Sequence, residues 1–167
     1  CVQTKTISVI TYNAPVAALS SQTNVLCKGE KNGSATISAN GGAPGYGYSW
    51  NTTPVQNTNI ATGLMVGAYM VTVTDQNGCS STQTVTITEP TALVIDTIST
   101  KATCRDNDGT ASVNANNTGT PSYSYSWGPL AGGQTSPTAV GLASGTYSCT
   151  VTDANGCTKT TMVNVAS

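Results

Sequence analysis

Residues 63–79 read GLMVGAYMVTVTDQNGC, and residues 141–157 read GLASGTYSCTVTDANGC, 78 positions later. The two stretches share both glycines, the leucine, the tyrosine, the Thr-Val-Thr-Asp run and the closing Asn-Gly-Cys. Self-similarity at a fixed period is the mark of a repeat protein. The sequence therefore predicts two copies of one structural unit.

Each copy of this stretch predicts a β-hairpin. Tyr69, Val71 and Val73 alternate with more polar positions, and a period of two is typical of a strand with one face in a core. Asp-x-Asn-Gly follows, where Asn and Gly supply the positive φ of a tight turn. A second alternating run comes after the cysteine, at 82–87 and again at 160–165. We therefore expect a hairpin with a cysteine just past its turn.

The composition favours a secreted β protein. Charged residues are 8% of the 167, the net charge is −1, and no basic patch is present, which excludes nucleic acid as an expected partner. Ser, Thr, Asn, Gln and Gly supply the polar surface instead. No stretch approaches the roughly 20 apolar residues of a membrane span, so we expect no membrane insertion. The absence of a signal peptide fits a processed mature segment or an excerpt of a longer chain.

The composition also argues against catalysis. Histidine is absent, so no Ser-His-Asp or Cys-His arrangement and no His-ligated zinc site can be built. The seven acidic residues fall mostly in turns, without a partner in an apolar setting. We expect a protein that is not an enzyme and needs no cofactor.

The repeat divides the chain into three parts: 1–12, 13–89 and 90–167. Each of the two long parts is punctuated by Gly, Pro and Asn turns and predicts about seven short strands, which is typical of an all-β sandwich. No segment keeps a helical apolar period. The predicted fold is two tandem β-sandwich domains preceded by an extra N-terminal strand.

The first part, 1–12, looks like the last strand of a repeat whose body is absent. Cys1 precedes Cys79 by the same 78 positions that separate Cys79 from Cys157. Four residues of this segment match the second hairpin strand and form a candidate assembly strand: Thr4, Thr6, Ile7 and Val9. Two explanations stay open: a donor strand that adds to another subunit, or the end of a preceding repeat.

At this point the residues support a family resemblance. The pattern is Cys27, Asn32-Gly33-Ser34-Ala35-Thr36-Ile37, Gly41-Gly42, Tyr46-x-Tyr48-x-Trp50 and the 63–79 stretch, closed by Pro90. It resembles the SprB-type repeat of secreted surface adhesins of gliding Bacteroidota, and it does so twice. The resemblance implies an Ig-like sandwich, an extracellular address, a role as a stalk or fibre module, and no catalytic residues. Cys149 departs from the pattern, because an aliphatic residue is usual there.

Six cysteines in a secreted β protein indicate a disulfide framework. Repeat logic pairs Cys27 with Cys79 and Cys104 with Cys157, with Cys104–Cys149 as the alternative in the second repeat. For Cys149 we favour a small buried hydrophobe in the place of Val71 over an intermolecular thiol. Cys1 fits a bond to a missing repeat or to a neighbouring subunit equally well.

Two aromatic sets recur in the repeats: Tyr46, Tyr48 and Trp50, and Tyr123, Tyr125 and Trp127. They could form a sugar-stacking platform. We favour core aromatics, because a core is needed in every repeat whereas a binding site is needed once.

Other motifs are weaker. Asp106 and Asp108 have the spacing of a calcium-loop fragment, but they lack the later ligands and a simple turn is favoured. Asn32, Asn51 and Asn116 begin N-glycosylation patterns, and Thr97 lies in a short O-glycosylation-like signal. We expect at least one of these sites to be modified.

The function expected is structural. Tandem sandwiches joined by a short linker such as Thr88-Glu89-Pro90 would keep a preferred angle and form a rod. Such a module fits an extracellular fibre, either as a segment of a long adhesin or as a subunit that assembles head to tail. The expected partners are copies of itself or adjacent repeats. The alternative is a carbohydrate-binding module that contacts surface glycans.

Overall fold

The computed structural model describes residues 3, 11–103 and 107–167. The candidate assembly strand, Cys1, Cys104 and Asp106 therefore lie outside the described residues. Within them the fold is all-β with antiparallel pairing throughout, as predicted, and the only helical turn is a short 3-10 turn, η1, at Pro129–Ala131. None of the described segments is a helix able to cross a membrane.

The chain forms two compact units. One consists of residues 1–25 and 31–88, and the other consists of residues 26–30 and 89–167. Leu26–Glu30 is thus grouped with the second unit although it lies between two strands of the first in sequence. Each unit has six strands among its described residues rather than the seven that the turn signals predict.

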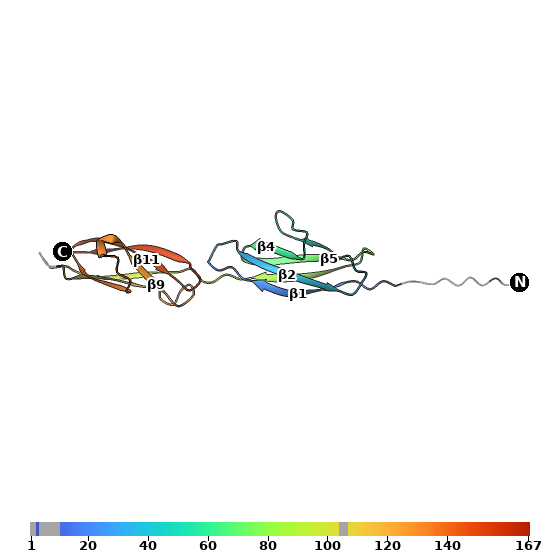
Figure 1. Cartoon of the computed structure of the whole chain (residues 1–167), viewed down its shortest axis with the longest axis horizontal. Coiled ribbons are helices and arrows are strands. Elements are labelled where there is room, and N and C mark those ends of the chain that lie inside the picture. The colour runs from blue at the N-terminus through green and yellow to red at the C-terminus, as the bar shows by residue number, and fades with distance from the viewer. Residues whose placement is uncertain (1–2, 4–10, 104–106) are drawn as a thin grey trace. The chain divides into compact units, whose positions relative to one another are not determined.

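The first unit is a sandwich of two three-stranded sheets (Figure 1). One sheet has the order β1-β2-β4 and the other has the order β3-β5-β6. The strands are β1 (Val16–Thr23), β2 (Gly33–Asn40), β3 (Gly47–Trp50), β4 (Ile60–Leu64), β5 (Gly67–Thr74) and β6 (Ser80–Ile87).

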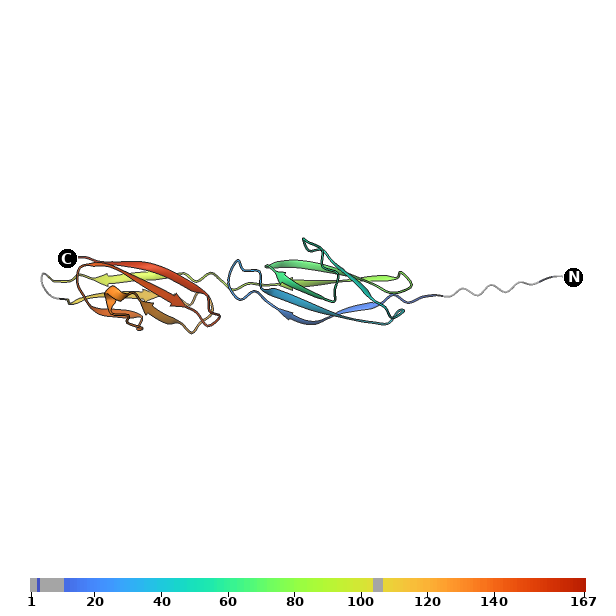
Figure 2. The ribbon, with the colours of Figure 1, turned by 45° about the horizontal axis from the view of Figure 1, so that its top comes forward.

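The second unit repeats this plan, as Figure 2 shows from another side. Its sheets have the orders β7-β8-β10 and β9-β11-β12. The strands are β7 (Asp96–Thr100), β8 (Gly109–Asn114), β9 (Ser124–Trp127), β10 (Thr138–Leu142), β11 (Gly145–Thr152) and β12 (Thr158–Val165). No seventh strand forms among the described residues: residues 51–59 are mostly polar with one proline, and residues 128–137 contain three glycines, two prolines and η1.

This strand order is that of an immunoglobulin-type sandwich without its fourth strand. In such sandwiches the sixth strand lies between the third and the seventh, and the second lies between the first and the fifth. Here β5 lies between β3 and β6, and β2 lies between β1 and β4. The Ig-like architecture predicted from the sequence is therefore present.

Both sheets of the first unit contribute to one core. Ile37 and Leu64 come from one sheet, and Trp50, Val71 and Val85 come from the other; all are 2% exposed or less. Burying side chains of this size stabilises the unit by roughly 1.5–3 kcal/mol each, measured against exposure to water. The alternating pattern of residues 69–73 is thus satisfied, with Val71 and Val73 inside the sandwich.

The predicted hairpin is present in both units and is paired regularly. β5 pairs with β6 from Gly67↔Ile87 to Thr74↔Ser80, and β11 pairs with β12 from Gly145↔Val165 to Thr152↔Thr158, without a register shift. Regular pairing over eight residues keeps Val71, Val73, Val85 and Ile87 on the core face, whereas Met70 lies on the exposed face. This hairpin is the longest regular pairing in each unit, and it carries the functional candidates described next.

Candidate functional site

The hairpin turn is closed by a buried carboxylate. Asp75 follows β5 and is 5% exposed. Its Oδ1 accepts hydrogen bonds from the backbone N–H groups of Asn77 and Cys79, both at 2.9 Å. Its Oδ2 accepts one from the N–H of Ala43 at 3.0 Å, which fastens the Gly41–Gly45 loop to the hairpin. One side chain therefore joins a local turn to a loop 32 residues earlier.

The surroundings of Asp75 favour its charged form. The hydrogen bond from Ala43, together with those from the turn, lowers the pKa of this carboxyl below its ordinary value. Desolvation by burial acts in the opposite direction but does not cancel this lowering. A close approach by Gly42 is required: a Cβ there would lie 2.5 Å from Asp75 Oδ2, and its φ is +59°. Glycine is the residue that accepts both constraints.

The second unit contains the same network. Asp153, also 5% exposed, accepts hydrogen bonds from the N–H groups of Asn155 and Cys157 and from that of Thr120, all at 2.9 Å. The Asp-x-Asn-Gly run predicts the turn, but the role of its Asp in joining loop and hairpin was not predicted. The signal that could have identified it is that the Asp recurs in both repeats, each time with a glycine in the preceding loop, Gly42 or Gly119.

The structure contains a disulfide between Cys27 and Cys157, with a Cα–Cα distance of 5.6 Å. The predicted pairs Cys27–Cys79 and Cys104–Cys157 are therefore wrong. The physical reason is that Leu26–Glu30 does not fold back on the hairpin of its own repeat but belongs to the second unit, where Cys157 follows the turn. Repeat logic identifies equivalent cysteines, but it cannot tell in which unit a loop is placed.

The remaining described cysteines are free. Cys79 is half-buried, and Cys149 is fully buried in the second core. Burial raises the pKa of the Cys149 thiol, and a thiol without exposed surface is not available to another chain. Cys149 thus acts as a small core residue opposite Trp127 in the sheet, in the position that Val71 holds opposite Trp50.

The two tryptophans lie in the cores, and the four tyrosines of the same sets are half-buried. Trp50 is 1% exposed and Trp127 is 2% exposed. Their indole N–H groups donate to the carbonyl oxygens of Thr58 and Ser136, both at 2.9 Å. Tyr46, Tyr48, Tyr123 and Tyr125 pack against the rims of the cores. A stacking platform would therefore have to use the tyrosines alone.

Tyr69 closes the corner at the start of β5. Its hydroxyl accepts a hydrogen bond from the N–H of Met65 at 3.1 Å and donates one to the carbonyl oxygen of Met65 at 3.2 Å. Tyr147 makes the matching bond to the carbonyl oxygen of Ala143 at 2.9 Å. Such a tyrosine corner is a hallmark of immunoglobulin-type sandwiches.

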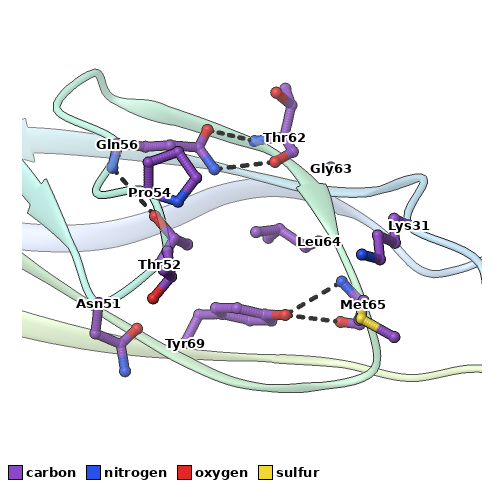
Figure 3. A pocket seen from close by; sticks show the side chains of 11 residues that line it. Lys31, Asn51, Thr52, Pro54, Gln56, Thr62, Gly63, Leu64, Met65 and Tyr69 are labelled. Carbon is purple, nitrogen blue, oxygen red and sulfur yellow. Dashed lines mark hydrogen bonds between the residues drawn. The ribbon is translucent and has the colours of Figure 1, made fainter.

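A depression of about 530 Å³ lies beside this corner in the first unit (Figure 3). It is lined by Lys31, residues 51–54, Gln56, residues 62–65 and Tyr69. Gln56 crosses it: the side-chain amide accepts from the N–H of Thr62 at 2.9 Å and donates to the carbonyl oxygen of Thr62 at 3.0 Å. Gln134 bonds Val140 in the same two ways in the second unit.

Four polar side chains of the depression make hydrogen bonds within the protein. Besides Gln56 and Tyr69, Thr52 accepts from the N–H of Gln56, and Asn51 accepts from the N–H of Met70. These bonds tie an irregular loop to the sandwich. The polar lining of the depression therefore holds the loop of residues 51–59 against the sandwich. Lys31 is the one charged residue among the lining residues.

One half of the calcium candidate, Asp106, lies outside the described residues, and within the part of the chain that the structure describes no three Cys, Asp or Glu side chains gather to hold a metal ion. Asp108 instead accepts hydrogen bonds from the backbone N–H of Thr103 at 2.7 Å and from its hydroxyl at 2.8 Å. These bonds lower the pKa of Asp108.

The candidate glycosylation residues are all exposed. Asn51 follows β3, Asn32 precedes β2, and Thr97 lies in β7. Asn116 has a φ of 50° and donates a hydrogen bond to Asp96. Modification at any of them stays a prediction.

Comparisons with known proteins give one family. The model of the SprB repeat matches residues 19–54, a stretch that includes β2 and β3. No curated protein matches the chain. Among solved structures, the chain is similar to one titled "Crystal structure of murine CEACAM1b", with 11% identity, coverage of 83% of this chain and 94% of that chain, and a TM-score of 0.31. The resemblance to the SprB repeat is therefore confirmed over residues 19–54.

Proposed function

We propose that this chain is a non-catalytic structural module of an extracellular fibre on the cell surface. The SprB repeat at residues 19–54 carries the proposal, because that repeat is typical of cell-surface adhesins. The disulfide between Cys27 and Cys157 supports it, because such bonds persist in oxidising compartments.

The construction of the units also supports a load-bearing role. In each unit one carboxylate, one glutamine and one tyrosine fasten loops to strands through backbone hydrogen bonds. A loop held at several points cannot be pulled out without breaking those bonds together. The chain fits either a segment of a long adhesin or a subunit that assembles head to tail.

The location is tested on intact cells that produce the protein. An antibody against the chain should label whole cells on thin fibres in electron micrographs, and external protease should remove the label. Labelling only after permeabilisation would contradict the proposal. A cytoplasmic protein of the same cells serves as the control for lysis.

Tryptophan quenching tests whether the Trp residues could serve a carbohydrate-binding module. Because Trp50 and Trp127 are buried, the emission of the native chain should be blue-shifted and should resist acrylamide. Strong quenching that a soluble glycan relieves would favour the carbohydrate-binding function instead.

A further inference from the structure

The two hairpin turns present the same asparagine in different surroundings. Each turn reads Asp-x-Asn-Gly-Cys, and the only difference is Gln76 against Ala154. In the second unit the side-chain amide of Asn155 donates to the carbonyl oxygen of Leu26 at 3.0 Å and to the Thr120 hydroxyl at 2.9 Å. Asn155 is half-buried. Its side chain is therefore held by two partners.

Asn77 in the first unit has neither of these partners. Ala43 holds the place of Thr120, because each donates its backbone N–H to the aspartate of its turn and accepts from the residue after that aspartate. Alanine, however, has no hydroxyl to offer. None of the hydrogen bonds among the described residues uses the side chain of Asn77, which is exposed and borders a depression of about 170 Å³ beside residues 11–13. Water and space for rotation are therefore available to this side chain.

An asparagine followed by glycine is prone to deamidation, because glycine has no side chain to shield its backbone nitrogen. The nitrogen of Gly78 attacks the side-chain carbonyl carbon of Asn77 and loses its proton. A new C–N bond forms, and the amide nitrogen takes up that proton and leaves as ammonia. Water then opens the succinimide ring at either carbonyl and gives aspartate or isoaspartate. Water is the only co-reactant.

We propose that Asn77 is a site of spontaneous deamidation and that Asn155, the same asparagine of the second unit, is protected from it. Ring closure requires the side chain to rotate onto the nitrogen of the next residue. Asn155 has to break two side-chain hydrogen bonds before it can rotate, whereas Asn77 does not have these bonds. In both turns the nitrogen under attack donates to the carbonyl oxygen of the turn aspartate at 3.0 Å, so this cost is shared.

Two other Asn-Gly pairs, at 32–33 and 40–41, lie at the two ends of β2. Gly33 is paired with β4, and Asn40 is paired with β1. Ring closure at either pair has to release a strand residue from the sheet. We therefore expect both pairs to react more slowly than Asn77.

Deamidation of Asn77 acts on the turn that Asp75 closes. The product carries a new carboxylate near that of Asp75, and the isoaspartate form adds a backbone atom between two N–H groups that Asp75 holds. Both changes weaken this network. Aged protein should therefore show a lower urea midpoint for the first unit and an unchanged midpoint for the second.

Peptide mapping of the native chain during incubation at mildly alkaline pH measures both turns in one experiment. Mass and chromatographic separation identify the aspartyl and isoaspartyl products. Asn77 should react about five- to a hundredfold faster than Asn155, the factor expected from two hydrogen bonds. In urea with a reductant the two turns differ only at Gln76 and Ala154, so their rates should become equal. Equal rates in the folded chain, or a difference that persists in urea, would overturn the proposal.

Exchanging the residues of the preceding loops tests the cause of the protection. Thr120→Ala removes one partner of the Asn155 amide and should speed the reaction there about two- to tenfold, with no change at Asn77. Ala43→Thr offers a hydroxyl to Asn77 and should slow its reaction by a similar factor. Thr158→Ala changes an exposed threonine next to the turn and should leave both rates unchanged. If Thr120→Ala and Thr158→Ala had the same effect on Asn155, the proposed protection by the hydroxyl would be wrong.

Discussion

At Asp75 a single carboxylate holds three backbone N–H groups from two segments of the chain. The glycine beside it is selected by contact as well as by φ, because a Cβ on Gly42 would collide with Asp75 Oδ2. Gly41 also has a positive φ, of +70°, but its nearest neighbour would be 3.9 Å away. Glycine is thus favoured at position 41 by its positive φ alone, and at position 42 by its positive φ and by the contact with Asp75. Mutation of each glycine can separate the two effects.

Gly42→Ala should destabilise the first unit more than Gly41→Ala. Both introduce a side chain at positive φ, which costs about 1 kcal/mol or more, and only Gly42→Ala adds the collision, for a total of roughly 2–4 kcal/mol. Urea unfolding followed by Trp50 fluorescence, in a Trp127→Phe background, measures the first unit alone. Equal losses would show that contact with Asp75 is unimportant.

Acid should weaken the first unit through Asp75. The pKa of this carboxyl is lowered in the folded state, so its contribution is complete above the unfolded value of 3.8 and is lost as the pH falls through the folded pKa. The free energy of unfolding, measured as above, should decline below about pH 4. Asp75→Asn should be less stable near neutral pH and should decline less on acidification. A parallel decline of both proteins would contradict the assignment.

At the scale of elements, the corner before β5 shows how a strand begins. Gly67 starts β5, and the Tyr69 hydroxyl reaches back to Met65, so the chain turns from β4 into β5 at a defined place. Tyr48 on β3 is also half-buried, but none of the hydrogen bonds of the described residues involves its hydroxyl. Tyr48 is therefore a suitable control for mutation of the Tyr69 hydroxyl.

Tyr69→Phe should lower the free energy of unfolding of the first unit by about 1–2 kcal/mol, because a hydroxyl with two backbone partners is removed. Tyr48→Phe should change it by less than about 0.5 kcal/mol. Denaturant midpoints with an unchanged slope give both values. A larger effect for Tyr48→Phe would show that the corner bond does not define the start of β5.

For the molecule as a whole, the main finding is that the second unit includes a short segment from the first repeat. The first unit is interrupted by Leu26–Glu30, and these residues are part of the second unit, tied there by a bond between cysteines 130 positions apart. Breaking this bond frees the loop from the second unit but removes no side chain from the core of the first. Stability should therefore change in one unit only.

Cys27→Ser should lower the free energy of unfolding of the second unit by about 2–4 kcal/mol, the usual effect of losing such a cross-link. Trp127 fluorescence in a Trp50→Phe background reports this unit. Cys79→Ser removes a free thiol and should leave the monomer unchanged. If Cys79→Ser were as harmful as Cys27→Ser, the pairing would be Cys27–Cys79.

Features that depend on neighbouring residues and on the repeat could be predicted from the amino-acid order. Alternation at 69–73 predicted the strand and its buried face, Asn-Gly predicted the hairpin turn, and the recurrence at 78 positions predicted a second copy. These features follow from local backbone geometry and from a period that can be counted. The SprB resemblance was available from the same residues.

Which distant groups meet depends on the folded chain and could not be predicted. The partner of Cys27, the Ala43 amide that Asp75 holds, and the depth of Trp50 in the core all depend on segments brought together across 8 to 130 positions. Pattern repeats give equivalent positions in both copies, and Cys27 and Cys104 remain equivalent in that sense. Whether a loop completes its own unit or the next one depends on packing free energies between remote segments, which no local period encodes.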